Sequence, residues 1–298
     1  MIKVLITGSN GLLGQKLTML LDNDPEIDVI ATSRGALNYR LSRGSFDKLD
    51  VTQREAVDHL ITTHKPDVVI HTAAMTQVDQ CETEQERCWL NNVTAVEHVV
   101  KACEKTATHL IHISTDFIFD GTYGPLDETA KPKPLSYYGK SKLAGEEIVQ
   151  KGSLDWAILR TVLVYGITKD MSRSNIVLWV KKSLEEGKTI HVVNDQWRTP
   201  TLAEDLAMGC LLTARKKAKG IYHVSGDEIM TPHDIAIRTA EFFQLDKSLI
   251  KVTDSTHFRQ PAPRPPKTGF IIEKAKRDLG YKPHSFVEGL GLIKSQII

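Results

Sequence analysis

The sequence of 298 residues lacks the marks of several protein classes. Its only cysteines are Cys81, Cys88, Cys103 and Cys210, with no Cys-x-x-Cys spacing, which predicts reduced, unpaired thiols rather than a disulfide framework or a zinc site. Its apolar runs are far shorter than the roughly 20 residues that cross a bilayer, and no basic, apolar signal segment begins the chain. The formal net charge is +1, so bulk electrostatics favour neither nucleic acid nor membrane as a partner. Together these absences predict a cytoplasmic protein.

What the sequence does contain suits a Rossmann fold. Hydrophobic residues make up 41% of the chain, enough for one large core or for a large and a small one. Up to about residue 165, helical patterns alternate with expected strands near residues 2–7, 27–32, 67–71, 108–114 and 156–160. This alternation predicts an α/β dinucleotide-binding domain over residues 1–165, a doubly wound parallel sheet with helices on both faces. The less regular remainder predicts a smaller mixed α/β substrate-binding domain over 166–298, with part of 190–225 rejoining the first.

A tyrosine and a lysine stand four residues apart at the start of an expected helix, in the segment Ser136–Lys142. This spacing places Tyr138 and Lys142 on one helix face. An ammonium beside a phenol favours the phenolate and lowers the tyrosine pKa from about 10, so the hydroxyl can exchange a proton near neutral pH. Tyr137 is a competing phenol, but it has no lysine four residues on. Alone, the pair is also compatible with a solvated helix face.

The N-terminus has a glycine-rich turn directly after the apolar run Ile2–Ile6. A buried strand, a glycine turn and a helix begin a dinucleotide-binding βαβ unit, whose helix N-terminus offers N–H groups to the phosphates. The spacing Gly-x-x-Gly-x-x-Gly departs from the commonest fingerprint. The residues expected to bind the cofactor here are Gly8, Asn10, Gly11, Leu12, Leu13 and Gly14.

The next two strands predict which nicotinamide cofactor is used. The second ends in Ser33-Arg34, where enzymes that select NAD usually have an acidic residue and where an arginine accommodates the 2′-phosphate of NADP. We therefore expect NADPH, with NADH as a second option and a solvated loop charge as the alternative for Arg34. Two interpretations of Asp50, which precedes Val51, stay open: an acceptor for the adenine amino group, or a helix-capping acid.

These motifs, in this order, resemble those of an extended short-chain dehydrogenase/reductase. Three further segments make the chain similar to the dTDP-4-dehydrorhamnose reductase family: Ala73–Glu82, Ser114–Gly121 and Asp195–Thr201. The resemblance extends to the C-terminal part, where Arg264–Thr268 is similar to the arginine-proline substrate segment of that family.

The resemblance implies NADPH-dependent reduction of the 4-keto group of a nucleotide-linked deoxysugar, in that family dTDP-4-dehydrorhamnose to dTDP-L-rhamnose. By this resemblance Tyr138 donates the proton, Lys142 lowers its pKa and binds the nicotinamide ribose, and Thr115 hydrogen-bonds the keto oxygen. Ser114, its neighbour along the strand, should point the other way. Further implied cofactor residues are Val51, Ala73, Ala74, Thr76 and Asn92. Implied substrate residues are Val78, Thr115, Asp116, Phe117, Trp197, Arg198 and Arg264.

Several alternatives stay open. Asn92 fits a helix cap as well as a site residue, and Trp197 fits plain packing as well as a substrate platform. Leu163 stands where the family often has tryptophan and Arg198 where it typically has glycine, which favours a related reductase or epimerase with another sugar. A third hypothesis is a non-catalytic NADP-binding regulatory subunit resembling methionine adenosyltransferase β. We interpret the strand histidines His71 and His112 as core residues and expect no metal site; a homodimer is compatible with the sequence.

Overall fold

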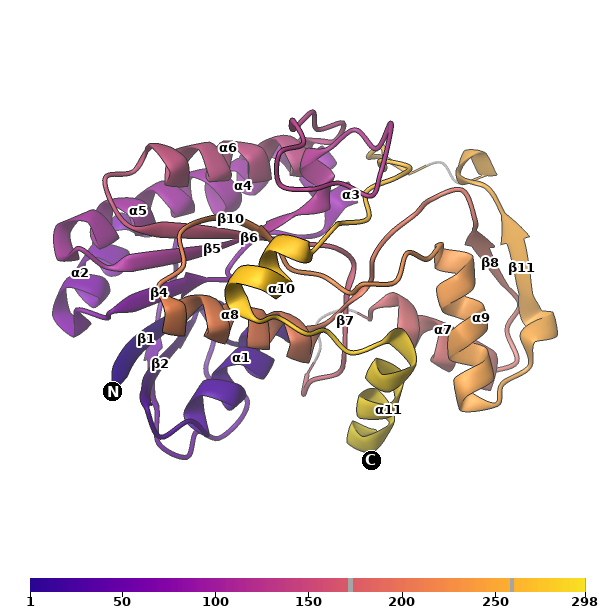
Figure 1. Cartoon of the computed structure of the whole chain (residues 1–298), viewed down its shortest axis with the longest axis horizontal. Helices are drawn as coiled ribbons and strands as arrows, with labels where there is room; N and C mark the ends of the chain where they lie inside the picture. Colours follow the sequence, from indigo (N-terminus) through magenta and orange to yellow (C-terminus); the bar gives the residue numbers. More distant parts are fainter. Residues whose placement is uncertain (171–173, 258–259, 298) are drawn as a thin grey trace.

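A seven-stranded parallel sheet forms the larger part of the molecule (Figure 1). The computed structural model describes residues 1–170, 174–257 and 260–297. In their order across the sheet, the strands are β10 (Gly220–His223), β6 (Trp156–Thr161), β5 (His109–Thr115), β4 (Val68–His71), β1 (Ile2–Thr7), β2 (Ile27–Ser33) and β3 (Ser45–Lys48). Every pairing between them is parallel.

The central strands are apolar on both faces, which is why they lie inside a parallel sheet. Val4, Leu5 and Ile6 of β1 are fully buried, as are the first three residues of β4. A strand covered on both faces needs a continuous apolar run rather than an alternating one. In register, Thr7 lies beside His71 and His71 beside His112, so β1 and β4 end together at the carboxyl edge of the sheet and β5 runs three residues further, to Thr115.

Helices cover both faces of the sheet (Figure 1). One face packs against α2 (Arg54–His64), α5 (Ala95–Thr106) and α6 (Tyr137–Lys151). The other face packs against α1 (Leu12–Asp22), α8 (Ala203–Lys216) and α10 (Glu273–Leu279). The expected doubly wound α/β fold is therefore confirmed. Two short helices, α3 (Val78–Thr83) and α4 (Gln85–Trp89), and a π-helical turn at Leu90–Thr94 connect β4 to α5.

A smaller group of elements lies beside the sheet, at the right of Figure 1. Helix α7 (Ile176–Glu185) packs on α9 (Pro232–Phe243), and β8 (Ile190–Val193) pairs in parallel with β11 (Ile250–Thr253). A capping box between Thr231 and Asp234 begins α9, with Pro232 as the first residue of the helix. The short strands β7 (Val164–Tyr165) and β9 (Thr201–Leu202) pair where the chain leaves and re-enters the sheet region, and α11 (Phe286–Gln296) ends the chain.

The chain returns to the sheet twice after β6. Helix α8 and strand β10 lie within the 190–225 segment, and β10 extends the sheet beside β6. Helix α10 later packs against α8 and β10. The local sequence pattern indicated neither β10 nor β11, which are both short strands. The division of the chain near residue 165 stays a prediction.

Within residues 1–170, 174–257 and 260–297, no helix combines the length and the apolar character needed to cross a membrane. The same residues hold no group of three or more histidine, cysteine or acidic side chains that could bind a metal ion.

A buried ion pair joins β6 to α6, the helix that carries Tyr138. Arg160 donates to both carboxylate oxygens of Glu146, at 2.9 and 2.7 Å, and the two side chains are 3% and 0% exposed. The guanidinium also lies 5.4 Å from the centre of the Phe119 ring. A paired, bidentate arrangement of this kind is the condition under which charges are tolerated in a core.

Replacing Arg160 with Met is therefore expected to destabilise the fold strongly. Glu146 would remain buried without its partner, which costs about 3–5 kcal/mol. Urea unfolding at neutral pH measures the change. Lys219→Ala is the control, because the Lys219–Asp155 pair is exposed and such pairs contribute only about 0–1 kcal/mol. Equal losses in the two variants would contradict this account of the core.

Candidate active site

The loops that follow β1, β4 and β5 meet at the carboxyl edge of the sheet, where open α/β sheets bind their ligands. Hydrogen bonds lock the first two loops together. The Thr72 hydroxyl donates to the carbonyl oxygen of Thr7 at 2.6 Å, and the amide of Ala73 donates to the Thr7 hydroxyl at 3.3 Å. The Thr7 hydroxyl also lies 2.8 Å from His71 Nδ1.

The glycine-rich turn forms a tight cradle that only glycine fits. Gly8 has a φ of +73°, and a Cβ there would lie 2.9 Å from the Cα of Ala73. At Gly14 a Cβ would lie 2.2 Å from the carbonyl oxygen of Gly8. Helix α1 begins after Gly11 with no side-chain cap, so its first N–H groups are left for an anion. These features fit the pyrophosphate of a dinucleotide. Leu12 and Leu13 form the first turn of α1.

Asn10 connects this cradle to the loop after β2. Its amide donates to the Ser33 hydroxyl at 3.0 Å and to the carbonyl oxygen of Ala36 at 2.8 Å. Ser33 is buried and Arg34 is exposed. The position of Arg34, directly after β2, leaves its guanidinium accessible to a cofactor phosphate.

The helix-capping interpretation of Asp50 is wrong. The residue that caps α2 is Gln53, and Asp50 instead accepts from the amide and the hydroxyl of Thr52, at 3.0 and 2.7 Å. This short turn holds Asp50 half-buried, next to the buried Val51, just beyond β3. Local side-chain bonding of aspartate to the residue two positions on explains the difference.

Asn92 does not cap a helix either; it lies inside the π-helical turn. Its side chain accepts from the amide of Met75 at 2.8 Å and donates to the carbonyl oxygen of Met75 at 2.9 Å. It also donates to the Ser141 hydroxyl of α6 at 3.1 Å. Asn92 therefore positions the loop after β4 against α6. In this loop Ala73 and Ala74 are half-buried and Thr76 is exposed.

Lys142 is buried at the sheet side of α6. Its ammonium donates to the carbonyl oxygen of Ile113 at 2.7 Å and lies 3.4 Å from His112 Nε2. Burial lowers the pKa of Lys142 to about 8, against the opposing effect of Glu146. His71 and His112 stack on each other, and burial lowers the pKa of His71 to about 3. These histidines are thus neutral core residues.

Tyr138 lies one turn before Lys142 in an apolar cluster. It is 7% exposed, and the Phe117 ring meets its ring edge-on with centroids 5.6 Å apart. Val78, Cys81 and Cys88 belong to the same cluster. All four cysteines of the chain are buried free thiols.

Thr115 ends β5, and its hydroxyl is already hydrogen-bonded. It donates to Asp116 Oδ1 at 3.0 Å and accepts from the amide of Phe117 at 3.3 Å. The second contact begins the 3-10 turn Asp116–Ile118, which places the Phe117 ring against the Tyr138 ring. The structure therefore links Thr115 to Tyr138 through one short turn.

A cavity of about 460 Å³ lies in the smaller group of elements. Asn175, Trp179, His191, Gln196 and Arg264 are among its lining residues. Of these, only Arg264 was among the expected substrate residues. Asn175 caps α7, which is the one local signal that could have drawn attention to it.

Arg264 reaches across to the sheet side. It donates to both carboxylate oxygens of Asp79 in α3, at 2.6 and 2.7 Å, and this bond lowers the pKa of Asp79. The amide of Ala262 also donates to Asp79. Asp79 was not among the predicted site residues, and no local pattern could have paired two residues so far apart.

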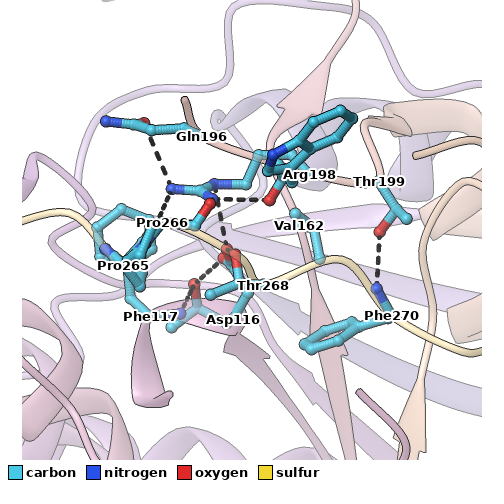
Figure 2. Close-up of polar contacts among 12 residues, drawn as sticks. Asp116, Phe117, Val162, Gln196, Arg198, Thr199, Pro265, Pro266, Thr268 and Phe270 are labelled. Atoms are coloured by element: carbon cyan, nitrogen blue, oxygen red, sulfur yellow. Dashed lines mark hydrogen bonds and ion pairs between the residues drawn. The ribbon is translucent and has the colours of Figure 1, made fainter. Parts of the chain in front are cut away.

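The neighbouring residues Gln196, Trp197 and Arg198 face three different places. Gln196 lines the larger cavity. Trp197 is 40% exposed and lines a separate cavity of about 270 Å³ with Pro125, Ile229 and Lys267. Arg198 is buried against Asp116 and Pro265 (Figure 2). The structure thus does not bring Trp197 and Arg264 into one cavity.

Leu163, where a tryptophan was expected from the resemblance, has an unusual backbone conformation. Its φ is +40°, a region that bulky residues rarely adopt and that is enriched at functional sites. The side chain is half-buried and contacts both the sheet core and the core beneath α7. Leu163 therefore packs between the two parts of the molecule.

Comparison with known proteins identifies the family. The family described as RmlD substrate binding domain matches residues 2–297. The chain belongs to this family. Its fold is similar to that of a dTDP-4-dehydrorhamnose reductase from Clostridium acetobutylicum ATCC 824, with a TM-score of 0.89, 28% identity and 99% of each chain covered.

Two further relatives bear on the function. A dTDP-4-dehydrorhamnose reductase from Bacillus anthracis, solved in complex with NADP, has a TM-score of 0.86 with 27% identity and 99% of each chain covered. Methionine adenosyltransferase 2 subunit beta of Xenopus laevis is 35% identical over 271 residues, which are 89% of this chain and 79% of that protein. The proteins similar to this chain, which share the extended short-chain dehydrogenase/reductase fold, are thus named for different functions.

Lys142→Met is expected to change how the stability of this family member depends on pH. Below about pH 8 the lysine is charged in both the folded and the unfolded chain, so folding bears the full cost of burying the ammonium. Above that pH the unfolded chain binds more protons, and the cost disappears as the pH approaches the ordinary lysine value of 10.5. Between about pH 7.5 and 10 the wild type should therefore gain ~2 kcal/mol relative to the variant.

Urea unfolding across this pH range measures the difference. Lys140→Met is the control, because Lys140 is exposed on the same helix and this variant should follow the wild type at every pH. Stability curves of Lys142→Met and wild type that run parallel would contradict the buried, pH-sensitive ammonium.

Proposed function

We propose that this chain is an NADPH-dependent reductase of the 4-keto group of a nucleotide-linked deoxysugar, with dTDP-4-dehydrorhamnose as the first substrate to test. The observation that carries the proposal is the arrangement of Thr115, Tyr138 and Lys142 at one edge of the sheet. The Thr115–Phe117 turn contacts Tyr138, and Lys142 is buried one turn further along the same helix. The glycine cradle fits the cofactor, and a similar reductase binds NADP.

The roles of the three residues follow from their chemistry. A reduced nicotinamide, when bound, would supply the hydride. Tyr138 would then give its phenolic proton to the developing alkoxide as general acid. Lys142, held by the Ile113 carbonyl oxygen, would stabilise the phenolate left behind. The Thr115 hydroxyl, which donates to Asp116 in the structure, would turn its single proton to the keto oxygen and stabilise charge as it appears there.

The expected cofactor residues and Arg264 fit this proposal, whereas Trp197 and Arg198 lie outside the larger cavity. The cofactor would lie along Gly8–Gly14, Asn10, Ser33, Arg34, Asp50, Val51, Ala73, Ala74, Thr76 and Asn92. The nucleotide part of the substrate would occupy the cavity of about 460 Å³ that Arg264 lines. In this arrangement residues 1–165 would bind the cofactor and the smaller part of the chain would bind the sugar nucleotide.

A second candidate function is supported by the methionine adenosyltransferase relative. Under it, the chain would bind NADP and regulate a partner enzyme without catalysis. The intact Thr115, Tyr138 and Lys142 favour the reductase, because a regulatory subunit has no need for a proton donor with a buried lysine beside it. Direct assay distinguishes the two.

Tyr138→Phe is expected to lower kcat by about 10²–10⁴-fold, the range that general acid catalysis supplies. The assay mixes the protein with NADPH and a panel of dTDP- and UDP-linked 4-keto sugars and follows loss of nicotinamide absorbance. Tyr137→Phe, with a phenol at the neighbouring position, should keep wild-type kcat. Unchanged kcat in Tyr138→Phe would remove the proposed proton donor. NADPH binding without turnover of any panel member would favour the regulatory function.

Arg34→Ala is expected to weaken NADPH binding about tenfold and NADH binding less than twofold, because only NADPH has the 2′-phosphate that the guanidinium would pair with. Fluorescence titration of each reduced cofactor measures both affinities. Arg40→Ala is the control, since Arg40 is also exposed in the region after β2. Equal effects of Arg34→Ala on the two cofactors would show the phosphate argument to be wrong.

A further inference from the structure

Arg198 is a buried cation whose polar contacts are to the loops that surround it (Figure 2). Arg198 as a whole residue is 4% exposed. One terminal nitrogen donates to the carbonyl oxygens of Trp197 and Pro266, at 2.8 and 3.2 Å. The other donates to the carbonyl oxygen of Pro265 at 2.6 Å and to Gln196 Oε1 at 3.4 Å. The third nitrogen, Nε, lies 3.6 Å from Asp116 Oδ2.

Asp116 completes the arrangement from the sheet side. It is 2% exposed, and burial raises its pKa while the Arg198 charge acts in the opposite direction. Its Oδ2 accepts from the Thr268 hydroxyl at 2.5 Å, and its Oδ1 accepts from the Thr115 hydroxyl at 3.0 Å. A carboxylate offers only acceptors, so as long as Asp116 is ionised the Thr115 hydroxyl must be the donor in their hydrogen bond.

The pair therefore holds three segments together. Asp116 follows β5, Arg198 lies just before β9, and Pro265 and Thr268 belong to the C-terminal loop that also carries Arg264. A guanidinium has five N–H donors in a fixed fork. Here the acceptors around it surround all three nitrogens, which leaves no free edge of the fork for a phosphate.

We propose that Arg198 and Asp116 are a positioning pair that holds the Thr115 side chain and the 265–268 segment at the candidate active site, so that the Thr115 hydroxyl can turn from Asp116 to the keto oxygen, and that Arg198 is not a ligand of the substrate phosphates. The inference deepens the proposed function, since it rests on Thr115 acting on the keto oxygen. In this proposal the two residues shape the site and do not contact the substrate.

A folding cycle tests the pair without any substrate. Arg198→Met and Asp116→Asn each leave one buried polar partner without its counter-charge, whereas the double variant removes both charges. We expect the loss in the double variant to be smaller than the sum of the single losses by at least a factor of ten in the folding equilibrium constant, about 1.4 kcal/mol. Urea unfolding measures all four proteins, and additive losses would overturn the proposal.

A kinetic cycle separates positioning from substrate binding. If the pair acts through Thr115, Arg198→Met and Asp116→Asn should each lower kcat at least tenfold, and Arg198→Lys should recover part of that loss. In a Thr115→Val background the further effect of Arg198→Met on kcat should fall below about threefold. If Arg198 instead bound a substrate phosphate, Arg198→Met would raise KM and leave kcat unchanged, and Asp116→Asn would have no effect. This result would overturn the proposal.

Binding of dTDP by calorimetry adds a control at the same loop. Arg264→Met is expected to lose at least tenfold in dTDP affinity because Arg264 lines the cavity. Arg198→Lys, which keeps the buried charge, should stay within about threefold of wild type; a loss as large as that in Arg264→Met would contradict the inference. If no keto sugar is reduced by the wild type, the proposed function fails, and the folding cycle alone decides whether the pair exists.

Discussion

The candidate site depends on one constraint, the shared carboxyl edge of the parallel sheet. Strands β1 and β4 end side by side at Thr7 and His71, and β5 runs on from His112 to Thr115, so the loops that follow these strands leave the sheet at the same edge. Parallel strands need long crossovers, and each crossover brings a helix N-terminus or a polar turn back to this edge. The glycine cradle, the Asn92 contacts and the Thr115 turn all occupy positions that this edge provides.

A second level of organisation joins the C-terminal loop to that edge through two ion pairs of different character. The Arg264–Asp79 pair is partly exposed, with side chains 17% and 42% accessible, so solvent weakens it and a charged ligand can compete for the arginine. The Arg198–Asp116 pair is buried, with side chains 5% and 3% accessible, and breaking one half leaves an uncompensated charge. The C-terminal loop is therefore held by a buried ion-pair network at residues 265–268 and by a weaker, partly exposed ion pair at Arg264, beside the larger cavity.

Family membership and function are separate conclusions for this chain. Proteins similar to this chain include one named as a dTDP-4-dehydrorhamnose reductase and one named as a subunit of methionine adenosyltransferase, which agrees with the rule that a fold hosts more than one activity. The reductase proposal therefore depends on the site itself: the buried Lys142, the enclosed Tyr138 and the hydrogen-bonded Thr115. The buried ion pair of Arg198 with Asp116 is a further feature of this site, and the fold alone does not explain it.

Local sequence alone determined the central strands, the glycine turn and the Tyr138–Lys142 helix face, because each arises from residue spacing within a few turns or strand lengths of the chain. The family resemblance pointed to Thr115 and to Arg264 as site residues. Only the tertiary structure decided the partners of Asn92, the pairing of Asp79 with Arg264, and the separation of Trp197 from the larger cavity. The short strands β10 and β11 also depended on it, since their neighbours in the sheets come from distant parts of the chain. Side-chain partners so far apart in sequence are selected by which surfaces pack together, and no local periodicity encodes that choice.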